Sequence, residues 1–159
     1  MAESLIKLTD CSKTEQYESL VRQLEALVGN EWDVIANMAN ISAAIKDVFG
    51  FLWVGFYIVK DDWLVLGPFQ GSIACTRIAR GRGVCGIAWQ ETRTLVVPDV
   101  NLFSGHIACS SLSKSEIVVP LVHQDKVWAV LDIDSSQPAH FDDVDAVYLN
   151  KIVGLISVV

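Results

Sequence analysis

The interval between apolar residues changes twice along this chain, and that change most limits the folds it can adopt. Residues 12–49 repeat apolar side chains at the helical interval of three or four, with a break at Gly29 and Asn30. From Phe51 to about residue 135, short β-branched and aromatic runs alternate with turn residues. Residues 142–157 return to the helical interval. We therefore expect two helices, then strands joined mostly by hairpins, then a closing helix.

This order predicts a mixed α/β (α+β) fold, with a central antiparallel sheet of about six strands and helices packed on it. No repeat or linker divides the chain, so we expect a single domain over residues 1–159. Its parts are two N-terminal helices in 12–49, a sheet with active-site loops in 51–135, and a C-terminal helix in 142–157. Residues 67–86 and 101–115 read as long loops, with a short helix near 83–90, and long loops in small domains are commonly functional.

The net charge of −7 argues against a nucleic-acid surface and against binding to anionic membranes. No apolar run approaches the roughly 20 residues of a membrane span, and the first twelve residues lack a secretory apolar region. We therefore expect a cytoplasmic protein, whose four cysteines are mostly reduced thiols.

Three of the cysteines, Cys75, Cys85 and Cys109, lie in or beside the two long loops. Glycines flank Cys85, and a helix beginning there would favour its reactive thiolate. Burial as small apolar side chains is one alternative. Zinc binding is another, although no C-x2-C pair is present.

Acidic residues gather on the last two strands of the predicted sheet. A strand period of two places Asp132 and Asp134 on one face together with Trp128 and Val130. Two adjacent acids repel each other. If other parts of the chain cover this face of the sheet, at least one of the acids should resist ionisation. Glu116 begins the preceding strand and adds a third acid. The alternative is a solvated strand end whose acids face water.

Aromatic residues alternate with a glycine on the first strand, at Phe51, Trp53, Gly55 and Tyr57. Such a stripe usually belongs to a core. A glycine inside a strand often marks the close approach of a ligand or of another backbone segment. We therefore expect Trp53 and Tyr57 to form the wall of a small apolar pocket.

Thiols, carboxyl groups and aromatic side chains together indicate a reaction class. A thiolate attacks an electrophilic sulfur or similar centre, and a carboxylic acid protonates the leaving oxygen. A second thiol then resolves the oxidised cysteine as a disulfide. His106 lies close to Cys109 in the sequence and could perturb its thiol.

Several motifs, in order, resemble the free methionine-(R)-sulfoxide reductases, which are GAF-domain enzymes. The resemblance runs from about Thr14 to the C-terminus. The motifs are Gly67-Pro-Phe-Gln-Gly71, Ala74-Cys-Thr-Arg-Ile78, Gly81-Arg-Gly-Val-Cys-Gly86, Gly105-His-Ile-Ala-Cys109, Ser115-Glu-Ile-Val-Val-Pro-Leu121 and Val130-Leu-Asp-Ile-Asp-Ser135.

The resemblance implies reduction of free L-methionine-(R)-sulfoxide through a cysteine sulfenic acid, in the defence against oxidative stress. Cys109 matches the nucleophile, and Cys85 and Cys75 match the cysteines that form disulfides with it. Glu116, Asp132 and Asp134 match acids that bind the sulfoxide and the ammonium group, with Asp134 or Glu116 as the proton donor. Trp53 and Tyr57 match the wall that holds the S-methyl group. Thioredoxin is the implied reductant, no metal or organic cofactor is implied, and a homodimer is expected.

Some positions depart from the pattern of this family. Ser104 replaces a frequent Pro, Ser110 a frequent Asp beside the nucleophile, and Ala129 a frequent Gly. Cys11 lies outside the motifs. Two rival functions remain: a non-catalytic GAF sensor of a small ligand such as a cyclic nucleotide, and a cysteine-bound metal or redox sensor. The acids argue against the nucleotide because they would repel its phosphate.

Overall fold

A six-stranded antiparallel sheet forms the centre of the molecule, in the strand order β3-β2-β1-β6-β5-β4. The structure is a computed structural model and describes residues 4–107 and 109–157; the ends of the expected domain, 1–3 and 158–159, lie outside the described residues. The predicted fold class is confirmed. The helices are α1 (Lys13–Val28), α2 (Val34–Phe49), α3 (Gly83–Glu91) and α4 (Asp143–Val153), with a short 3₁₀ helix η1 (Val100–Leu102). The strands are β1 (Trp53–Lys60), β2 (Trp63–Gln70), β3 (Arg77–Ala79), β4 (Leu95–Val97), β5 (Ser115–His123) and β6 (Lys126–Ser135).

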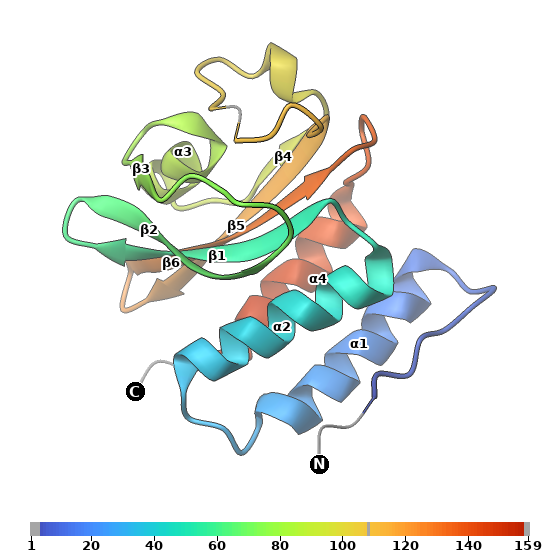
Figure 1. Cartoon of the computed structure of the whole chain (residues 1–159). Helices are drawn as coiled ribbons and strands as arrows, with labels where there is room; N and C mark the ends of the chain where they lie inside the picture. Colours follow the sequence, from blue (N-terminus) through green and yellow to red (C-terminus); the bar gives the residue numbers. More distant parts are fainter. Residues whose placement is uncertain (1–3, 108, 158–159) are drawn as a thin grey trace.

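The two faces of the sheet carry different layers (Figure 1). Helices α1, α2 and α4 cover one face and bury a core with alternate residues of β1, such as Val54 and Phe56. The intervening residues Trp53 and Tyr57 point to the opposite face, where they join a second core with α3 and the long loops. The alternation of a single central strand therefore separates a structural face from a face that is available for a site.

Side-chain caps set where the two N-terminal helices begin. Ser12 caps α1 and forms a capping box with Glu15. The side chain of Asp33 accepts a hydrogen bond from the backbone N–H of Ala36, so α2 begins at Val34 and not near residue 31. Gly50 ends α2 with a φ of 67°, in the left-handed region that favours glycine. No helix in the described part of the chain is long and apolar enough to cross a membrane.

The expected loop over residues 67–86 is shorter in the structure, because β2 continues to Gln70 and β3 follows it. Gly67 and Pro68 look like strand breakers in the sequence, yet they lie inside β2. β3 pairs only with the segment from Trp63 to Val65, so Pro68 lies on an open edge where no N–H is needed.

Three further details of the sequence interpretation are wrong. Phe51 precedes β1 and packs in the helix-side core against Phe141, so it does not share the face of Trp53. Trp128 also packs against the helix-side core and not beside the acids, next to a register shift between β5 and β6. The last helix ends at Val153, because Gly154 stops it four residues before the expected position.

A buried carboxylate joins the first and last helices. Asp145 is 1% exposed and accepts hydrogen bonds from the hydroxyl of Tyr17 at 2.7 Å and from Nζ of Lys13 at 2.6 Å. It also accepts the backbone N–H of Asp142 at 2.9 Å, which completes the capping box of α4. One side chain thus fixes the start of α4 and its position against α1.

We predict that Asp145→Ala lowers the free energy of unfolding by about 3 kcal/mol, because it leaves the Tyr17 hydroxyl and the Lys13 ammonium without their buried partner. Urea denaturation measures the loss. Asp143→Ala, at an exposed position in the same helical turn, is the control and should have a much smaller effect. Equal losses for the two variants would contradict the assigned role of Asp145.

Candidate active site

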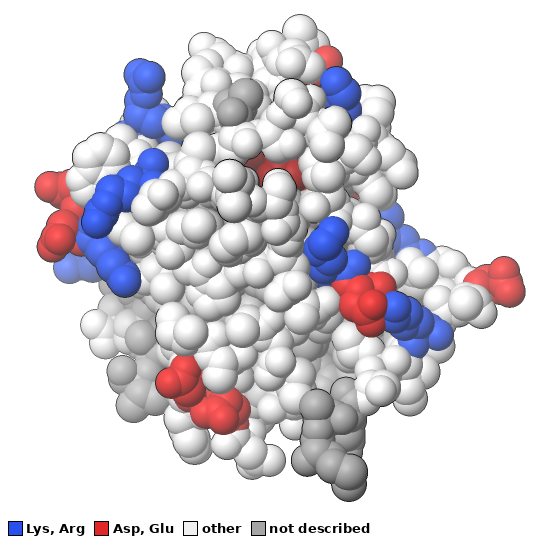
Figure 2. All heavy atoms as spheres, in the orientation of Figure 1, with Lys and Arg blue, Asp and Glu red and all other residues white. Residues whose placement is uncertain are grey.

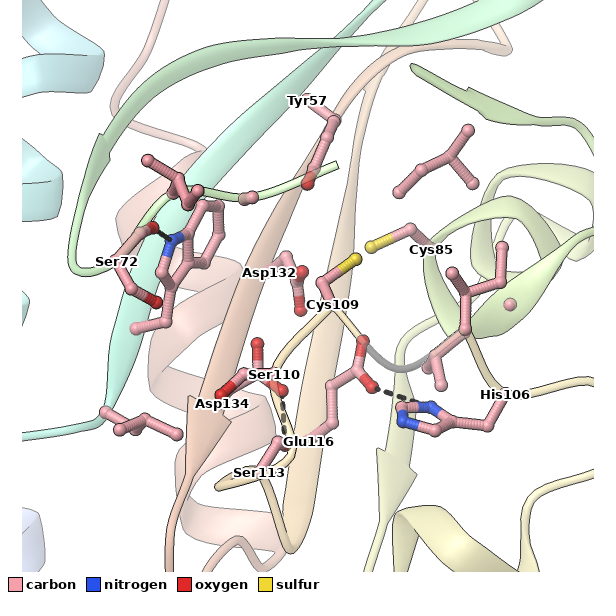
Figure 3. Close-up of a pocket in the computed structure, with 18 residues that line it drawn as sticks. Tyr57, Ser72, Cys85, His106, Cys109, Ser110, Ser113, Glu116, Asp132 and Asp134 are labelled. Carbon is pink, nitrogen blue, oxygen red and sulfur yellow. Dashed lines mark hydrogen bonds and ion pairs between the residues drawn. The ribbon is translucent and has the colours of Figure 1, made fainter. Parts of the chain in front are cut away.

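A pocket lies on the sheet face opposite α1, α2 and α4, under the loops before β3 and before β5 (Figure 3). Figure 2 shows a hollow surrounded by uncharged side chains, with acidic atoms visible inside it. The pocket collects residues from β1, β5, β6, α3 and both loops, segments that are far apart in the sequence. Its lining includes Trp53, Tyr57, Ser72, Ile73, Cys85, His106, Ile107, Cys109, Ser113, Glu116, Asp132 and Asp134.

Three carboxyl groups converge in the pocket because of the pairing between β5 and β6. Glu116 of β5 is the direct cross-strand partner of Asp134 on β6, and Val118 is the partner of Asp132. The period of two turns Asp132 and Asp134 to the pocket, while Ile133 between them enters the helix-side core. The predicted convergence of these acids is present, and the alternative of a solvated strand end is wrong, since Glu116 and Asp132 are buried.

Burial and mutual repulsion make these carboxyl groups weak acids. Burial, followed by the charges of Asp132 and Asp134, raises the pKa of Glu116 well above its usual range. Burial, followed by the charge of Asp134, does the same to the pKa of Asp132. Burial raises the pKa of Asp134 to about 6, although a hydrogen bond from the Ser113 hydroxyl opposes the shift. Near neutral pH the cluster therefore holds protons that it can donate.

The cysteines occupy two different environments. Cys75 and Cys109 form a disulfide between the two loops, with their Cα atoms 5.9 Å apart. Cys109 is exposed and Cys75 half-buried, so a molecule in solution can reach this pair. Cys85 is a free thiol, buried in the first turn of α3 against Asp132.

The expectation that the start of a helix would activate Cys85 is wrong. Helix α3 does begin at Gly83, but burial, followed by the nearby Asp132 and Glu116, raises the pKa of the Cys85 thiol. Loss of solvent and the neighbouring carboxyl groups oppose the ionisation that the start of a helix would favour. Cys85 is thus held as a neutral thiol, while Cys109 is the sulfur open to reaction.

Two aromatic side chains hold the loop that carries Cys75. The indole Nε1 of Trp53 donates to the carbonyl of Ser72 at 3.0 Å, and the hydroxyl of Tyr57 donates to the carbonyl of Cys75 at 3.0 Å. Their ring centroids lie 6.0 Å apart, and both line the pocket. The predicted aromatic wall is therefore present, and it also positions one of the sulfurs.

Gly55 permits this wall, though for a different reason from the expected one. A Cβ at residue 55 would lie 2.5 Å from the ring of Trp53 and 2.4 Å from Cβ of Phe69. The close neighbours are thus the aromatic side chains themselves and not a ligand. Phe69 stacks on Trp53 with the ring centroids 5.3 Å apart and so supports the wall from outside the pocket. The sequence interpretation missed Phe69 because residues 67–86 read as a loop.

Two polar residues complete the acid cluster. Ser113 hydrogen-bonds Asp134, and nothing in the sequence distinguishes it from the other serines of that loop. His106 lines the pocket together with Cys109, and its Nδ1 lies 3.7 Å from Oε2 of Glu116, a contact that the sequence did not predict. Burial lowers the pKa of His106, so near neutral pH the imidazole supplies no positive charge to the acids.

The comparison with known proteins agrees with this geometry. The family model described as GAF domain matches residues 33–159. The chain is 46% identical over 147 residues to a protein of Escherichia coli named free methionine-R-sulfoxide reductase, and the match covers 92% of this chain and 89% of that protein. The chain belongs to the free methionine-R-sulfoxide reductase family of GAF domains.

Two further proteins match over almost the whole chain. GAF domain-containing protein A of Dictyostelium discoideum is 57% identical, over 99% of both chains. The X-ray structure of the free methionine-R-sulfoxide reductase from Neisseria meningitidis, in complex with its substrate, superposes with a TM-score of 0.93 at 48% identity. That superposition covers 96% of this chain and 92% of the Neisseria chain.

We predict that Gly55→Ala displaces Trp53, because the added Cβ has no room beside the indole. The variant should remain folded yet show an altered near-ultraviolet circular dichroism spectrum and weaker ligand binding in the pocket. Gly67→Ala is the comparison variant, since its Cβ would lie 3.1 Å from the carbonyl oxygen of Phe56, a milder clash that a shift of a few tenths of an ångström relieves. An unchanged aromatic spectrum in Gly55→Ala would contradict the proposed packing.

We predict that Asp134→Asn stabilises the fold increasingly as pH rises. The folded-state pKa of Asp134 is raised above the unfolded value of about 4, so ionising this group costs folding free energy. The stability gain of the variant over the parent should be small near pH 4, grow to about pH 6, and then remain constant. Denaturant titrations at several pH values measure it, and a gain independent of pH would contradict the raised pKa.

Proposed function

We propose that this protein reduces free L-methionine-(R)-sulfoxide to methionine through a sulfenic acid on Cys109. The observation that carries the proposal is an exposed, disulfide-forming sulfur at a pocket lined by three carboxyl groups and an aromatic wall. The names of the Escherichia coli and Neisseria relatives support the substrate.

Each part of the substrate has a matching partner in the pocket. The ammonium group supplies the cation that Glu116, Asp132 and Asp134 lack, since no Lys or Arg pairs with them among the described residues. The S-methyl group lies against Trp53 and Tyr57. A methionine sulfoxide within a peptide has no free ammonium, so the pocket selects the free amino acid.

The chemistry begins once the Cys75–Cys109 disulfide has been reduced. The Cys109 thiolate attacks the sulfoxide sulfur, and a protonated carboxyl group, Asp134 or Glu116, donates a proton to the sulfoxide oxygen. The oxygen is transferred to Cys109 as sulfenic acid, and methionine leaves. A second thiol displaces that oxygen as water and forms a disulfide.

Cys75 is the better candidate for this second thiol, because it is the cysteine bonded to Cys109. Cys85 is buried and its thiol is held neutral beside Asp132, which makes it a poorer nucleophile. Thioredoxin then returns both cysteines to thiols by dithiol exchange. We propose that the enzyme acts in the cytoplasm as a homodimer against oxidative stress, and that it needs no metal or organic cofactor because its thiols carry the electrons.

The decisive experiment is a thioredoxin-coupled assay on the separated R and S sulfoxide diastereomers of free methionine, with peptide-bound sulfoxide as a third substrate. We expect turnover with the free R form alone. Comparable rates on the peptide would contradict the selection by the acids, and no turnover on any sulfoxide would contradict the proposed function.

We predict that Cys109→Ser abolishes methionine formation, because near neutral pH a serine hydroxyl is a far weaker nucleophile than a cysteine thiolate. Cys11→Ser is the matched control: Cys11 is a free cysteine outside the pocket, and its replacement should leave the rate unchanged. Substantial activity in Cys109→Ser would assign the nucleophile to another residue.

We predict that Cys75→Ser still reduces the sulfoxide at Cys109 but cannot form the disulfide that thioredoxin reduces. The variant should form about one methionine per protein in a single turnover, because Cys109 still attacks, and then stop with thioredoxin as reductant. Mass spectrometry after trapping should find a sulfenic acid at Cys109. Sustained thioredoxin-coupled turnover in this variant would assign the resolving role to Cys85.

A further inference from the structure

Cys85 is not needed for the proposed cycle, yet it belongs to a compact group of possible metal ligands. The sulfur of Cys85 and one carboxylate oxygen each from Glu116 and Asp132 lie within 4.8 Å of one another, and all three residues are buried. They project from α3, β5 and β6, so regular secondary structure fixes their separation (Figure 3). Zinc–ligand bonds of about 2.0 to 2.3 Å require the ligand atoms to be somewhat closer than this limit, and small side-chain rotations can bring them together.

A second observation indicates that the hydrogen-bonding capacity of this group is incompletely satisfied. Asp132 is only 7% exposed, and its buried Oδ1 accepts no hydrogen bond from a backbone, hydroxyl or cationic donor among the described residues. Its polar neighbours are the Cys85 thiol and the Glu116 carboxyl group, which belong to the group itself. The buried Nδ1 of His106 has no hydrogen-bond partner among the described residues either, and it lies 3.7 Å from Oε2 of Glu116. Buried polar atoms are normally paired, so these atoms mark a position that a bound species completes.

We infer that Cys85, Glu116 and Asp132 form a binding site for Zn²⁺, with His106 adjacent to the fourth coordination position. One sulfur and two carboxylate oxygens form a mixed donor set that suits a borderline-soft divalent ion. Zinc accepts tetrahedral sites of three protein ligands with one exchangeable position. Mg²⁺ and Ca²⁺ prefer sites made of oxygen alone.

Zinc binding at this group has a measurable consequence. A thiol and a carboxylic acid bind zinc in their deprotonated forms, so zinc displaces their protons into the solvent.

The metal site overlaps the part of the pocket assigned to the substrate. Zn²⁺ on Glu116 and Asp132 would occupy the acids that receive the ammonium group. We therefore expect zinc to inhibit the reductase in competition with methionine sulfoxide, a consequence that rests on the proposed function. Binding of the ion itself does not depend on that function.

The test uses the oxidised protein, in which Cys75 and Cys109 are bonded and the free thiols are Cys11 and Cys85. Co²⁺ titration should give about one equivalent with a sulfur-to-cobalt charge-transfer band, as expected for a single thiolate ligand. The band should vanish in Cys85→Ser and persist in Cys11→Ser. Zn²⁺ should displace Co²⁺, release protons measurable by calorimetry in two buffers, and raise the melting temperature of the parent protein.

Asp132→Asn is the second variant, and it keeps the thiol and the shape of the side chain. It should weaken Zn²⁺ binding at least about tenfold. Replacing a residue that only hydrogen-bonds a metal ligand already lowers metal affinity by about this factor. Absence of the cobalt band in the parent, its loss in Cys11→Ser, or unchanged zinc affinity in Asp132→Asn would each overturn the inference.

Steady-state assays with and without a chelator separate the two proposals. Competitive inhibition by Zn²⁺, relieved by the chelator, supports both of them. Zinc binding in a protein that turns over no sulfoxide would leave the metal site standing and remove the proposed function. Turnover without zinc binding would remove the metal site alone.

Discussion

The site depends on the burial of three carboxyl groups on one sheet face, with no Lys or Arg paired to them in the part of the chain that the structure describes. Glu116, Asp132 and Asp134 are brought together by strand pairing, so they cannot separate without breaking the sheet. Their repulsion and their loss of solvent oppose folding, and the cluster responds by retaining protons. Both proposed roles of the pocket follow from this arrangement: proton donation to an oxygen and attraction of a positively charged ligand.

The acid cluster lowers the stability of the fold, and the apolar core on the helix-covered face of the sheet offsets this loss. Ile133, between Asp132 and Asp134, is fully buried against the helices, as are Leu131 and Ile117. Each of these residues contributes on the order of 2 kcal/mol through burial of its side chain. Because acidic and apolar residues alternate on the same strand, the segment that carries the catalytic candidates is also among the best-anchored in the fold.

Much of this structure follows from the sequence, because alternation and capping are local signals. The helix start near Ser12, the shared face of Trp53 and Tyr57, and the shared face of Asp132 and Asp134 follow from local capping and spacing. The start of α2 after Asp33 lies later than the sequence interpretation placed it. The other failures have a common cause. The strand around Pro68, the contact between His106 and Glu116, and the high pKa of Cys85 depend on partners distant in the sequence. A single sequence does not specify such partners.

The hydrogen bonds from Trp53 to Ser72 and from Tyr57 to Cys75 have an evolutionary consequence. The surface against which a ligand rests and the loop that carries a redox sulfur are connected through the same two side chains. A substitution that reshaped the pocket for a bulkier ligand would therefore also move Cys75. Divergence towards new ligands in this lineage must then proceed through compensating pairs of changes, or must abandon the disulfide altogether.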